Sequence, residues 1–201
     1  MPKGFETNYN HMMLYYMLQN RIFNQRKMAD DLGWKFGARV NSFVRWLEES
    51  KYIRKTLDPN TGKLAYEVPS RAALLGFYAR FRDMSKEKLL VRKIGRDYNA
   101  VMKYLSDNGA VMCLTTALQF YDDNFRDITI HAYAENRKLM EIIPRQEEGD
   151  IQVNLYAYDF VDKTQKEKGI RITSPIRTIM DLYCNNMAYT AERLIAKEWQ
   201  H

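Results

Sequence analysis

The sequence predicts an α+β fold, with an N-terminal winged helix-turn-helix followed by a small mixed α/β domain. Its first 70 residues show three amphipathic segments and then a β-hairpin pattern, and short strands alternate with helices after residue 108. Residues 1–90 hold 16 Lys and Arg against 9 Asp and Glu, whereas residues 91–201 hold 15 against 16. We expect a winged-helix domain over 1–70, a helical connector over 71–108 and a mixed domain over 109–201.

Three helices are expected in the N-terminal domain. Apolar residues recur at helical spacing over 11–19, 25–32 and 38–50. The second segment stops at Gly33, because glycine readily adopts the left-handed backbone that ends helices. The apolar stripe of the third segment consists of Val40, Phe43, Val44 and Leu47.

A β-hairpin follows the third helix. Residues 52–57 and 64–68 have strand character, and the segment between them reads Asp-Pro-Asn-Thr-Gly. Proline fixes one backbone dihedral while asparagine and glycine permit positive φ, so this segment predicts a turn. Three helices followed by a strand, a turn and a strand match the order of elements in winged helix-turn-helix proteins.

The rest of the chain is expected to mix helices and strands. The pattern over 70–108 indicates two or three helical pieces, with helices over 71–81 and 98–105. Strands are expected over 110–114, 127–133, 151–158 and 170–173, and helices over 115–120, from Ser174-Pro175 onward, and over 189–199. In the strand over 127–133, Ile128, Ile130 and Ala132 are expected to share one face.

The third helix is the candidate recognition helix. In a helix-turn-helix the second helix of the pair lies in the major groove of DNA, where arginine reads guanine edges and serine or asparagine supplies hydrogen bonds. Outside its apolar stripe this helix carries Arg39, Asn41, Ser42 and Arg45. The alternative is that Arg39 and Arg45 are solvent-exposed side chains that contact no DNA.

Further cations flank this helix and are candidates for phosphate contact. They are Arg26, Lys27 and Lys35 before the helix, and Arg54, Lys55 and Lys63 on the hairpin. Trp46 is expected to be a partly buried core or interface residue rather than a DNA contact. Glu48 and Glu49 argue against DNA contact at the C-terminal end of the helix.

Composition excludes several other classes of protein. No apolar run approaches 18 residues and residues 1–10 lack an apolar signal core, so we expect a cytoplasmic protein with no membrane segment. Cys113 and Cys184 are expected to be buried thiols, with a disulfide between them as the alternative. The three histidines form no spaced cluster, and the sequence indicates no metal site and no cofactor.

No enzyme motif is found. The P-loop, the Gly-rich dinucleotide turn, H-E-x-x-H, G-x-S-x-G and the Gly-Ser turn of nucleotidyltransferases are all missing. Asp122-Asp123 is a carboxylate pair that fits a solvated turn. A nuclease-like set of Asp150 with Glu167 and Lys168 is a weaker alternative. We therefore expect no catalytic residues.

Three stretches of the chain resemble the AbiEi family of antitoxins from type IV toxin–antitoxin and abortive-infection systems. They are the N-terminal winged helix, AVMCLTTALQFYDDNFRDITIHAY at 110–133 and GIRITSPIRTIMDLYCNNMAYTAERLI at 169–195. The resemblance implies a non-enzymatic autorepressor that binds its own promoter. It also implies a C-terminal domain that neutralises a nucleotidyltransferase-like toxin. The matching C-terminal positions are Ser174, Pro175, Arg177, Thr178, Asp181 and Leu182, for which a structural role (a cap, a helix start, an ion pair) is favoured.

The sequence leaves two other functions open. One is a nuclease or nucleotidyltransferase-like enzyme that a winged helix targets to nucleic acid. The other is an adaptor whose winged helix docks a protein through Trp46, Tyr52 and Tyr66. If the chain binds palindromic DNA, a homodimer is expected, because such sites mirror two-fold protein symmetry.

Overall fold

The computed structural model describes residues 8–134, 138–143, 148–158 and 164–199. The chain divides into two compact units, residues 1–81 and 82–201. Both contain helices and strands, as the predicted α+β class requires. Within the described ranges, no helix combines the length and the apolar composition that crossing a bilayer demands.

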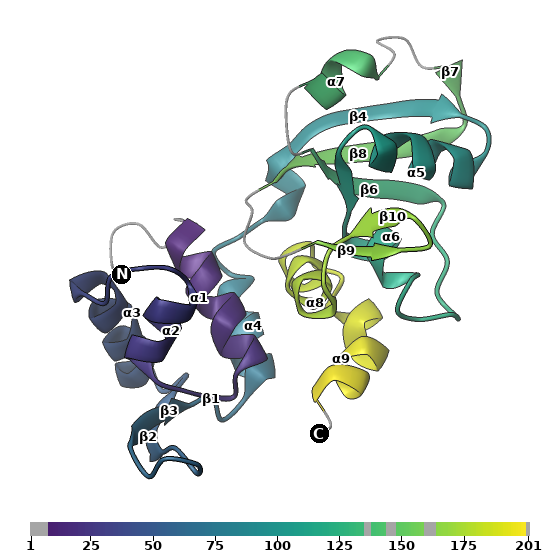
Figure 1. The fold of residues 1–201 in the computed structure, drawn as a ribbon. Coiled ribbons are helices and arrows are strands. Elements are labelled where there is room, and N and C mark those ends of the chain that lie inside the picture. Colours follow the sequence, from purple (N-terminus) through teal and green to yellow (C-terminus); the bar gives the residue numbers. More distant parts are fainter. Residues whose placement is uncertain (1–7, 135–137, 144–147, 159–163, 200–201) are drawn as a thin grey trace. The chain divides into compact units, whose positions relative to one another are not determined.

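The first unit packs four helices against a small sheet (Figure 1). The helices are α1 (Asn8–Gln19), α2 (Gln25–Asp31), α3 (Ala38–Glu49) and α4 (Arg71–Tyr78). The strands are β1 (Ile22–Phe23), β2 (Arg54–Leu57) and β3 (Leu64–Glu67). The sheet is antiparallel in the order β1-β3-β2. The expected helices and hairpin are present, whereas the short strand β1 was not predicted.

Local sequence explains where these elements begin and end. The Asn24 side chain caps α2 by accepting hydrogen bonds from the backbone N–H groups of Arg26 and Lys27. Gly33 follows α2 with φ of +72° and lets the chain turn toward α3. In the hairpin turn, the Asp58 carboxylate accepts the N–H groups of residues 60 and 61, and Gly62 has φ of +65°.

The four residues of the predicted α3 stripe are all buried. Met13, Leu14, Met17 and Leu18 of α1 are also fully buried in this unit. Trp46 lies beside this stripe, and its ring centroid is 5.0 Å from that of Phe77 in α4. Trp46 is half-buried, as expected for a partly buried core or interface residue.

The second unit is built on a seven-stranded mixed sheet of order β7-β4-β8-β6-β5-β10-β9. Its strands are β4 (Lys88–Gly95), β5 (Ala110–Met112), β6 (Thr129–Ala134), β7 (Glu148–Gly149), β8 (Ile151–Ala157), β9 (Gln165–Glu167) and β10 (Ile170–Ile172). Its helices are η1 (Met84–Glu87), α5 (Tyr98–Asp107), α6 (Leu114–Leu118), α7 (Lys138–Ile142), α8 (Pro175–Cys184), η2 (Ala188–Ala191) and α9 (Glu192–Trp199).

The prediction of a helical connector over 71–108 is wrong. Helix α4 belongs to the first unit, and residues 88–95 form the strand β4 rather than a helix. The strand arises from long-range antiparallel pairing with β8, which no local periodicity reveals. Ile128 was also misplaced: β6 begins one residue later, and Ile128 is 85% exposed.

The two faces of the large sheet differ in chemistry. Ile130, Ala132, Val153 and Leu155 point to an apolar core that α5 covers. Because side chains alternate along a strand, Tyr133 points to the opposite face, where it meets α8. The sheet therefore has one apolar side and one side with buried polar groups.

The polar side is organised by a buried charge network. In α8, Arg177 Nε donates to Asp181 Oδ1 at 2.8 Å, and both side chains are fully buried. Arg82 donates to Asp181 at 3.4 Å and pairs with Glu87 at 2.8 Å. Both arginines also donate to the Tyr133 hydroxyl, and burial raises the pKa of Tyr133. The structural role expected for Arg177 and Asp181 is confirmed.

The cysteines and the α8 cap also follow expectation. Cys113 and Cys184 are both buried free thiols, and burial raises the pKa of Cys184. Ser174 caps α8 by accepting a hydrogen bond from the Arg177 N–H, and Pro175 occupies the first turn.

Candidate nucleic-acid interface

The outer face of α3 is the centre of the candidate interface. Opposite the buried stripe lie Ala38, Ser42, Arg45 and Glu49, all exposed. Arg45 forms no ion pair with any residue that the structure describes, so its guanidinium is available to a ligand. Ser42 Oγ donates to the Ala38 carbonyl oxygen at 2.7 Å. The Ser42 hydroxyl is therefore disposed to accept a hydrogen bond from a partner.

Arg39 lies on one flank of α3 rather than at the centre of its outer face. Its guanidinium carbon is 4.5 Å from the centroid of the Tyr9 ring on α1. The Tyr9 ring in turn lies 4.7 Å from the Trp34 ring. This stacking holds an exposed arginine in one position while leaving its N–H edges available. Asn41 lies on the other flank and is half-buried.

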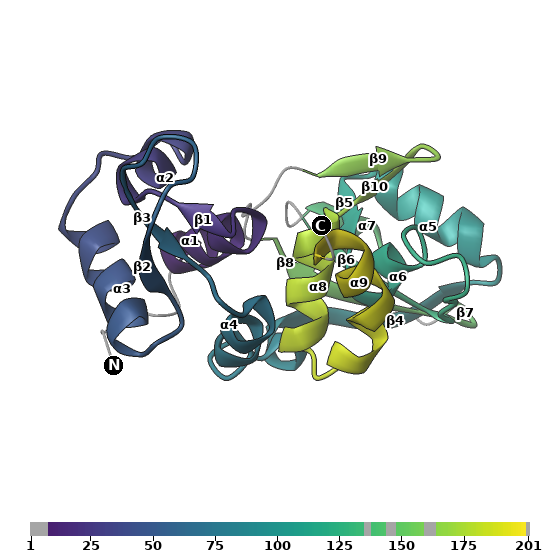
Figure 2. The ribbon, with the colours of Figure 1, turned by 90° about the horizontal axis from the view of Figure 1, so that it is seen from below.

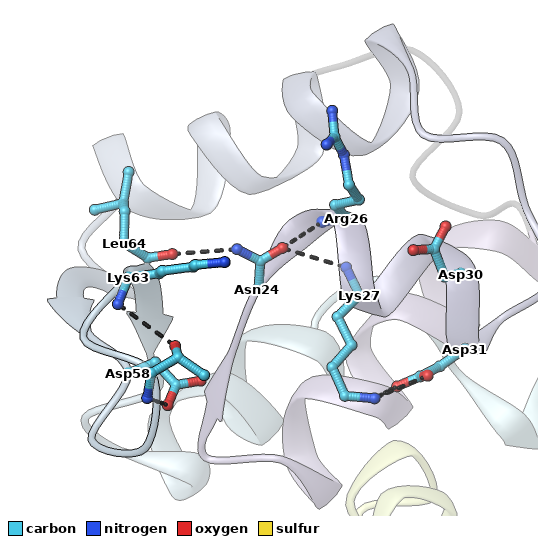
Figure 3. Close-up of a pocket in the computed structure, with 9 residues that line it drawn as sticks. Asn24, Arg26, Lys27, Asp30, Asp31, Asp58, Lys63 and Leu64 are labelled. Atoms are coloured by element: carbon cyan, nitrogen blue, oxygen red, sulfur yellow. Dashed lines mark hydrogen bonds and ion pairs between the residues drawn. The ribbon is translucent and has the colours of Figure 1, made fainter.

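The start of α2 is tied to the hairpin (Figures 2 and 3). Asn24 Nδ2 donates to the Leu64 carbonyl oxygen at 3.1 Å, so one side chain both caps the helix and holds β3. Figure 3 shows Arg26 extending away from Lys63, and its guanidinium carbon lies 5.8 Å from the Phe36 ring centroid. Like Arg39, Arg26 is exposed but rests on an aromatic ring.

Lys27 forms an ion pair with Asp31. Its Nζ lies 2.8 Å from Asp31 Oδ2, one helical turn away. The Tyr16 hydroxyl donates to the same carboxylate at 2.7 Å. Hydrogen bonds from Lys27 and Tyr16 lower the pKa of Asp31. The predicted phosphate contact by Lys27 would therefore have to displace this pair.

Two hairpin cations are also paired. Arg54 lies 2.7 Å from Glu67, directly across the ladder, and Arg21 lies 3.2 Å from the same carboxylate. The hydrogen bond from Arg54 lowers the pKa of Glu67. Lys55 reaches Glu48 of α3 at 3.0 Å, and this contact raises the pKa of Lys55. In both pairs the cation is exposed while its carboxylate partner is half-buried, so a phosphate contact by Arg54 or Lys55 would have to compete with that carboxylate.

A hollow of about 650 Å³ separates the start of α2 from the hairpin turn (Figure 3). Arg26, Lys27 and Lys63 contribute positive charge to its wall, and Asp30, Asp31 and Asp58 contribute negative charge. Because these charges balance, we assign no anion site to the hollow. Lys63, at the turn, forms no ion pair with a described residue.

The ten residues predicted as DNA contacts thus fall into three groups. Lys35, Arg45 and Lys63 are exposed cations that form no ion pair within the described ranges. Arg26, Lys27, Arg39, Arg54 and Lys55 are exposed but hold an aromatic ring or a carboxylate. Asn41 and Ser42 are polar neighbours on α3.

Sequence reasoning missed the side chains that position these cations. The ion pair of Lys27 with Asp31 could have been predicted from the sequence, because residues four apart share a helix face. The pair of Arg54 with Glu67 follows from the hairpin register once the turn is fixed. The contacts of Arg39 with the Tyr9 ring and of Arg26 with the Phe36 ring could not be predicted, because in each case the ring and the arginine belong to different segments of the chain.

The carboxylates singled out in the second half do not converge. Asp122 pairs with Arg193 at 3.5 Å. Asp150 follows β7 and Glu167 lies in β9, which are the two opposite edges of the sheet. In the part of the chain that the structure describes, no three His, Cys, Asp or Glu side chains are grouped so that they could hold a metal ion.

Comparisons with protein-family models, with curated proteins and with solved structures found no match to this chain. We therefore infer its function from its own residues. The first unit presents exposed arginines and lysines on a helix and a hairpin, and such groups bind phosphates and guanine edges. In the second unit, by contrast, the ion pairs of Arg82 and Arg177 with Asp181 are buried.

Proposed function

We propose that the protein is a DNA-binding transcriptional regulator whose first unit is a winged helix-turn-helix. The order α1-β1-α2-α3-β2-β3, with the hairpin strands in one sheet with β1, supports this proposal. The observation that carries it most is the outer face of α3, where Arg45 and Ser42 are exposed opposite a completely buried stripe. Such a helix suits insertion into the major groove.

In this proposal α3 reads bases and the hairpin holds the backbone. Arg45 makes the bidentate contact to guanine, and Arg39 is held ready on the Tyr9 ring for a second contact. Ser42 accepts a hydrogen bond from an adenine or cytosine amino group, since its own proton is used by Ala38. Lys63 at the hairpin turn contacts a phosphate.

The distribution of charge favours the first unit as the part that meets DNA. Residues 1–81 hold 13 Lys and Arg against 7 Asp and Glu, whereas residues 82–201 hold 18 against 18. A net positive unit attracts a polyanion and releases counterions from it on binding. The second unit has no such excess.

We further propose that the regulator is an antitoxin-like autorepressor in the cytoplasm, acting as a homodimer on a palindromic promoter site. The resemblance of residues 110–133 and 169–195 to AbiEi antitoxins supports this part. A nucleotidyltransferase-like toxin would then contact the surface of the second unit. It would not contact Arg177 or Asp181, because both side chains are fully buried.

The adaptor alternative depends on three aromatic residues that also make contacts within the first unit. Trp46 and Tyr52 both pack on Phe77, with ring centroids 5.0 and 4.5 Å apart. The Tyr66 ring stacks on Phe23 at 5.8 Å. All three side chains are half-buried, so they contribute to packing within the first unit, and the DNA-binding proposal does not use them.

A binding titration tests the proposal. The full chain is titrated against a duplex of its own upstream DNA and against a scrambled duplex of equal length, at two salt concentrations. We expect tighter binding to the upstream duplex and weaker binding to both at the higher salt. Equal affinity for the two duplexes would reject a sequence-specific regulator, and absence of binding would reject the DNA interface altogether.

A further inference from the structure

The second unit contains a hollow of about 480 Å³ that the DNA-binding proposal does not use. It lies among the helix α5, the C-terminal end of α6 and the turn between β9 and β10. Its volume is within the range of small-molecule binding sites. All of its walls belong to the second unit, so its shape does not depend on the first.

Three cations from three separate elements line this hollow. They are Lys103 of α5, Arg126 of the loop before β6, and Lys168 of the turn between β9 and β10, and all three are exposed. Asp123 is the single acidic side chain in the lining. Lys103 also pairs with Asp107, outside the hollow, at 3.0 Å. Because the second unit has no net charge overall, this positive excess is local rather than part of a basic surface.

Lys168 lies in a tight turn whose backbone is left-handed. Lys168 and Gly169 have φ of +50° and +82°, and Glu167 pairs with Ile170 across this two-residue turn. A two-residue hairpin turn with positive φ at both positions favours asparagine followed by glycine, because a Cβ atom crowds the backbone there and asparagine tolerates this conformation better than most residues. The turn therefore fixes the backbone of an exposed lysine that lines the hollow.

The floor of the hollow suits a flat ring. Met102, Phe120 and Ile170 supply an apolar surface at the edge of the sheet core. The Gln119 amide beside them is oriented by its neighbours, since Nε2 donates to the Tyr98 hydroxyl at 3.0 Å and to the Thr116 carbonyl at 3.1 Å. Its amide oxygen is then left to accept a hydrogen bond from a ring amino group or a hydroxyl.

We propose that this hollow binds a phosphorylated small molecule of the nucleotide class. The ring lies on Phe120 and Met102, Gln119 accepts from its amino or hydroxyl group, and the phosphates lie among Lys103, Arg126 and Lys168. A lining with two more positive than negative charges matches a phosphate monoester, which carries nearly two negative charges at neutral pH. The site stands independently of the DNA-binding proposal.

Calorimetric titration of the full chain tests this proposal. The probes are a panel of nucleoside mono- and diphosphates (AMP, ADP, GMP, GDP, CMP and UMP), with adenosine and inorganic phosphate as partial ligands. We expect at least one nucleotide to bind, and both partial ligands to bind more weakly, because each lacks one half of the recognition. No binding by any nucleotide up to millimolar concentration would overturn the proposal.

The matched variants are Lys168→Asn and Lys166→Asn. Asparagine fits the left-handed turn position, so Lys168→Asn should fold at least as well as the original chain and still lose about tenfold in nucleotide affinity. Lys166 is exposed on the adjoining strand, outside the hollow, and its variant should bind normally. Equal affinity in the Lys168→Asn variant, or displacement of the nucleotide by short duplex DNA, would refute a nucleotide site.

Discussion

The two units use arginine in opposite ways. In the first unit, Arg39 and Arg45 are exposed on a helix, one on a tyrosine ring and one with no ion pair to a described residue. In the second unit, Arg82 and Arg177 are buried and donate to Asp181 and Tyr133. Ion pairs of exposed arginines add little to the free energy of unfolding, so these side chains can bind a ligand instead. Buried arginines need a charged or hydrogen-bonding partner, because an unpaired buried charge destabilises the fold. The same residue type thus indicates binding where it is exposed, as on α3, and architecture where it is buried, as at Arg82 and Arg177.

The largest effect should come from breaking the buried network. Asp181→Asn leaves Arg82 and Arg177 without their shared carboxylate, and removing one partner of a buried pair costs about 3–5 kcal/mol. Urea denaturation should show this loss in the free energy of unfolding. Asp107→Asn is the control, because Asp107 pairs with Lys103 at the surface. Equal urea midpoints for the two variants would contradict the contrast between the units.

A second effect should appear on acidification. Burial lowers the pKa of His131 to about 4, with Lys88 adding to the shift and Asp127 opposing it. Because the unfolded histidine titrates near 6.5, the unfolded state binds the proton first as the pH falls. Stability is therefore full above pH 6.5 and declines between 6.5 and 4, by up to about 3 kcal/mol from this group. Denaturation at a series of pH values should show less of this decline in His131→Asn; an unchanged pH profile would exclude His131 as its source.

On the first unit, Arg45→Ala should weaken binding to upstream DNA without changing stability. Loss of a bidentate base contact costs about 1–3 kcal/mol, or roughly a 5- to 150-fold rise in Kd. Arg80→Ala is the matched control, because Arg80 is exposed in the same unit but lies beyond α4. Fluorescence anisotropy with a labelled duplex would measure both. Equal losses would mean that only net charge matters.

The smallest effect concerns Glu48, which holds Lys55 at 3.0 Å. Glu48→Gln frees the lysine and removes a negative charge from α3, so we expect DNA affinity to rise by about two- to fivefold. The gain should shrink when Lys55→Gln is added, which a double-mutant cycle measures. A gain that persists in full would show that Lys55 does not reach DNA.

Local sequence was sufficient for much of the first unit. The stripe of α3, the Gly33 stop and the Asp58–Gly62 turn are all set by residues near each other in the chain, and the structure contains all three. The short strand β1 was missed because two residues paired with β3 leave no periodic pattern. Likewise, the aromatic supports of Arg26 and Arg39 come from other elements and have no local signature.

The second unit was less predictable because its contacts are long-range. The pair of Arg177 with Asp181 spans one helical turn and was anticipated. Arg82, which completes the network, lies 99 residues before Asp181. The strand β4 lies in a segment predicted to be helical, because its strand partners, β8 and β7, are more than 50 residues away in the sequence. Nor did the sequence suggest that Lys103, Arg126 and Lys168 line one hollow.

The measurement that tests the central claim most directly is the salt dependence of DNA binding. The original chain is compared with a triple variant, Lys35→Gln, Arg45→Gln and Lys63→Gln, and with a control triple variant in the second unit, Lys93→Gln, Arg96→Gln and Lys197→Gln. If Lys35 and Lys63 meet phosphates while Arg45 contacts a base, the slope of log K against log salt should fall in magnitude by about 0.9 for each lysine lost, and the loss of Arg45 should weaken binding without a comparable change in slope. The control should keep the original slope. Equal slopes for the two triple variants would contradict the assignment of DNA binding to the first unit.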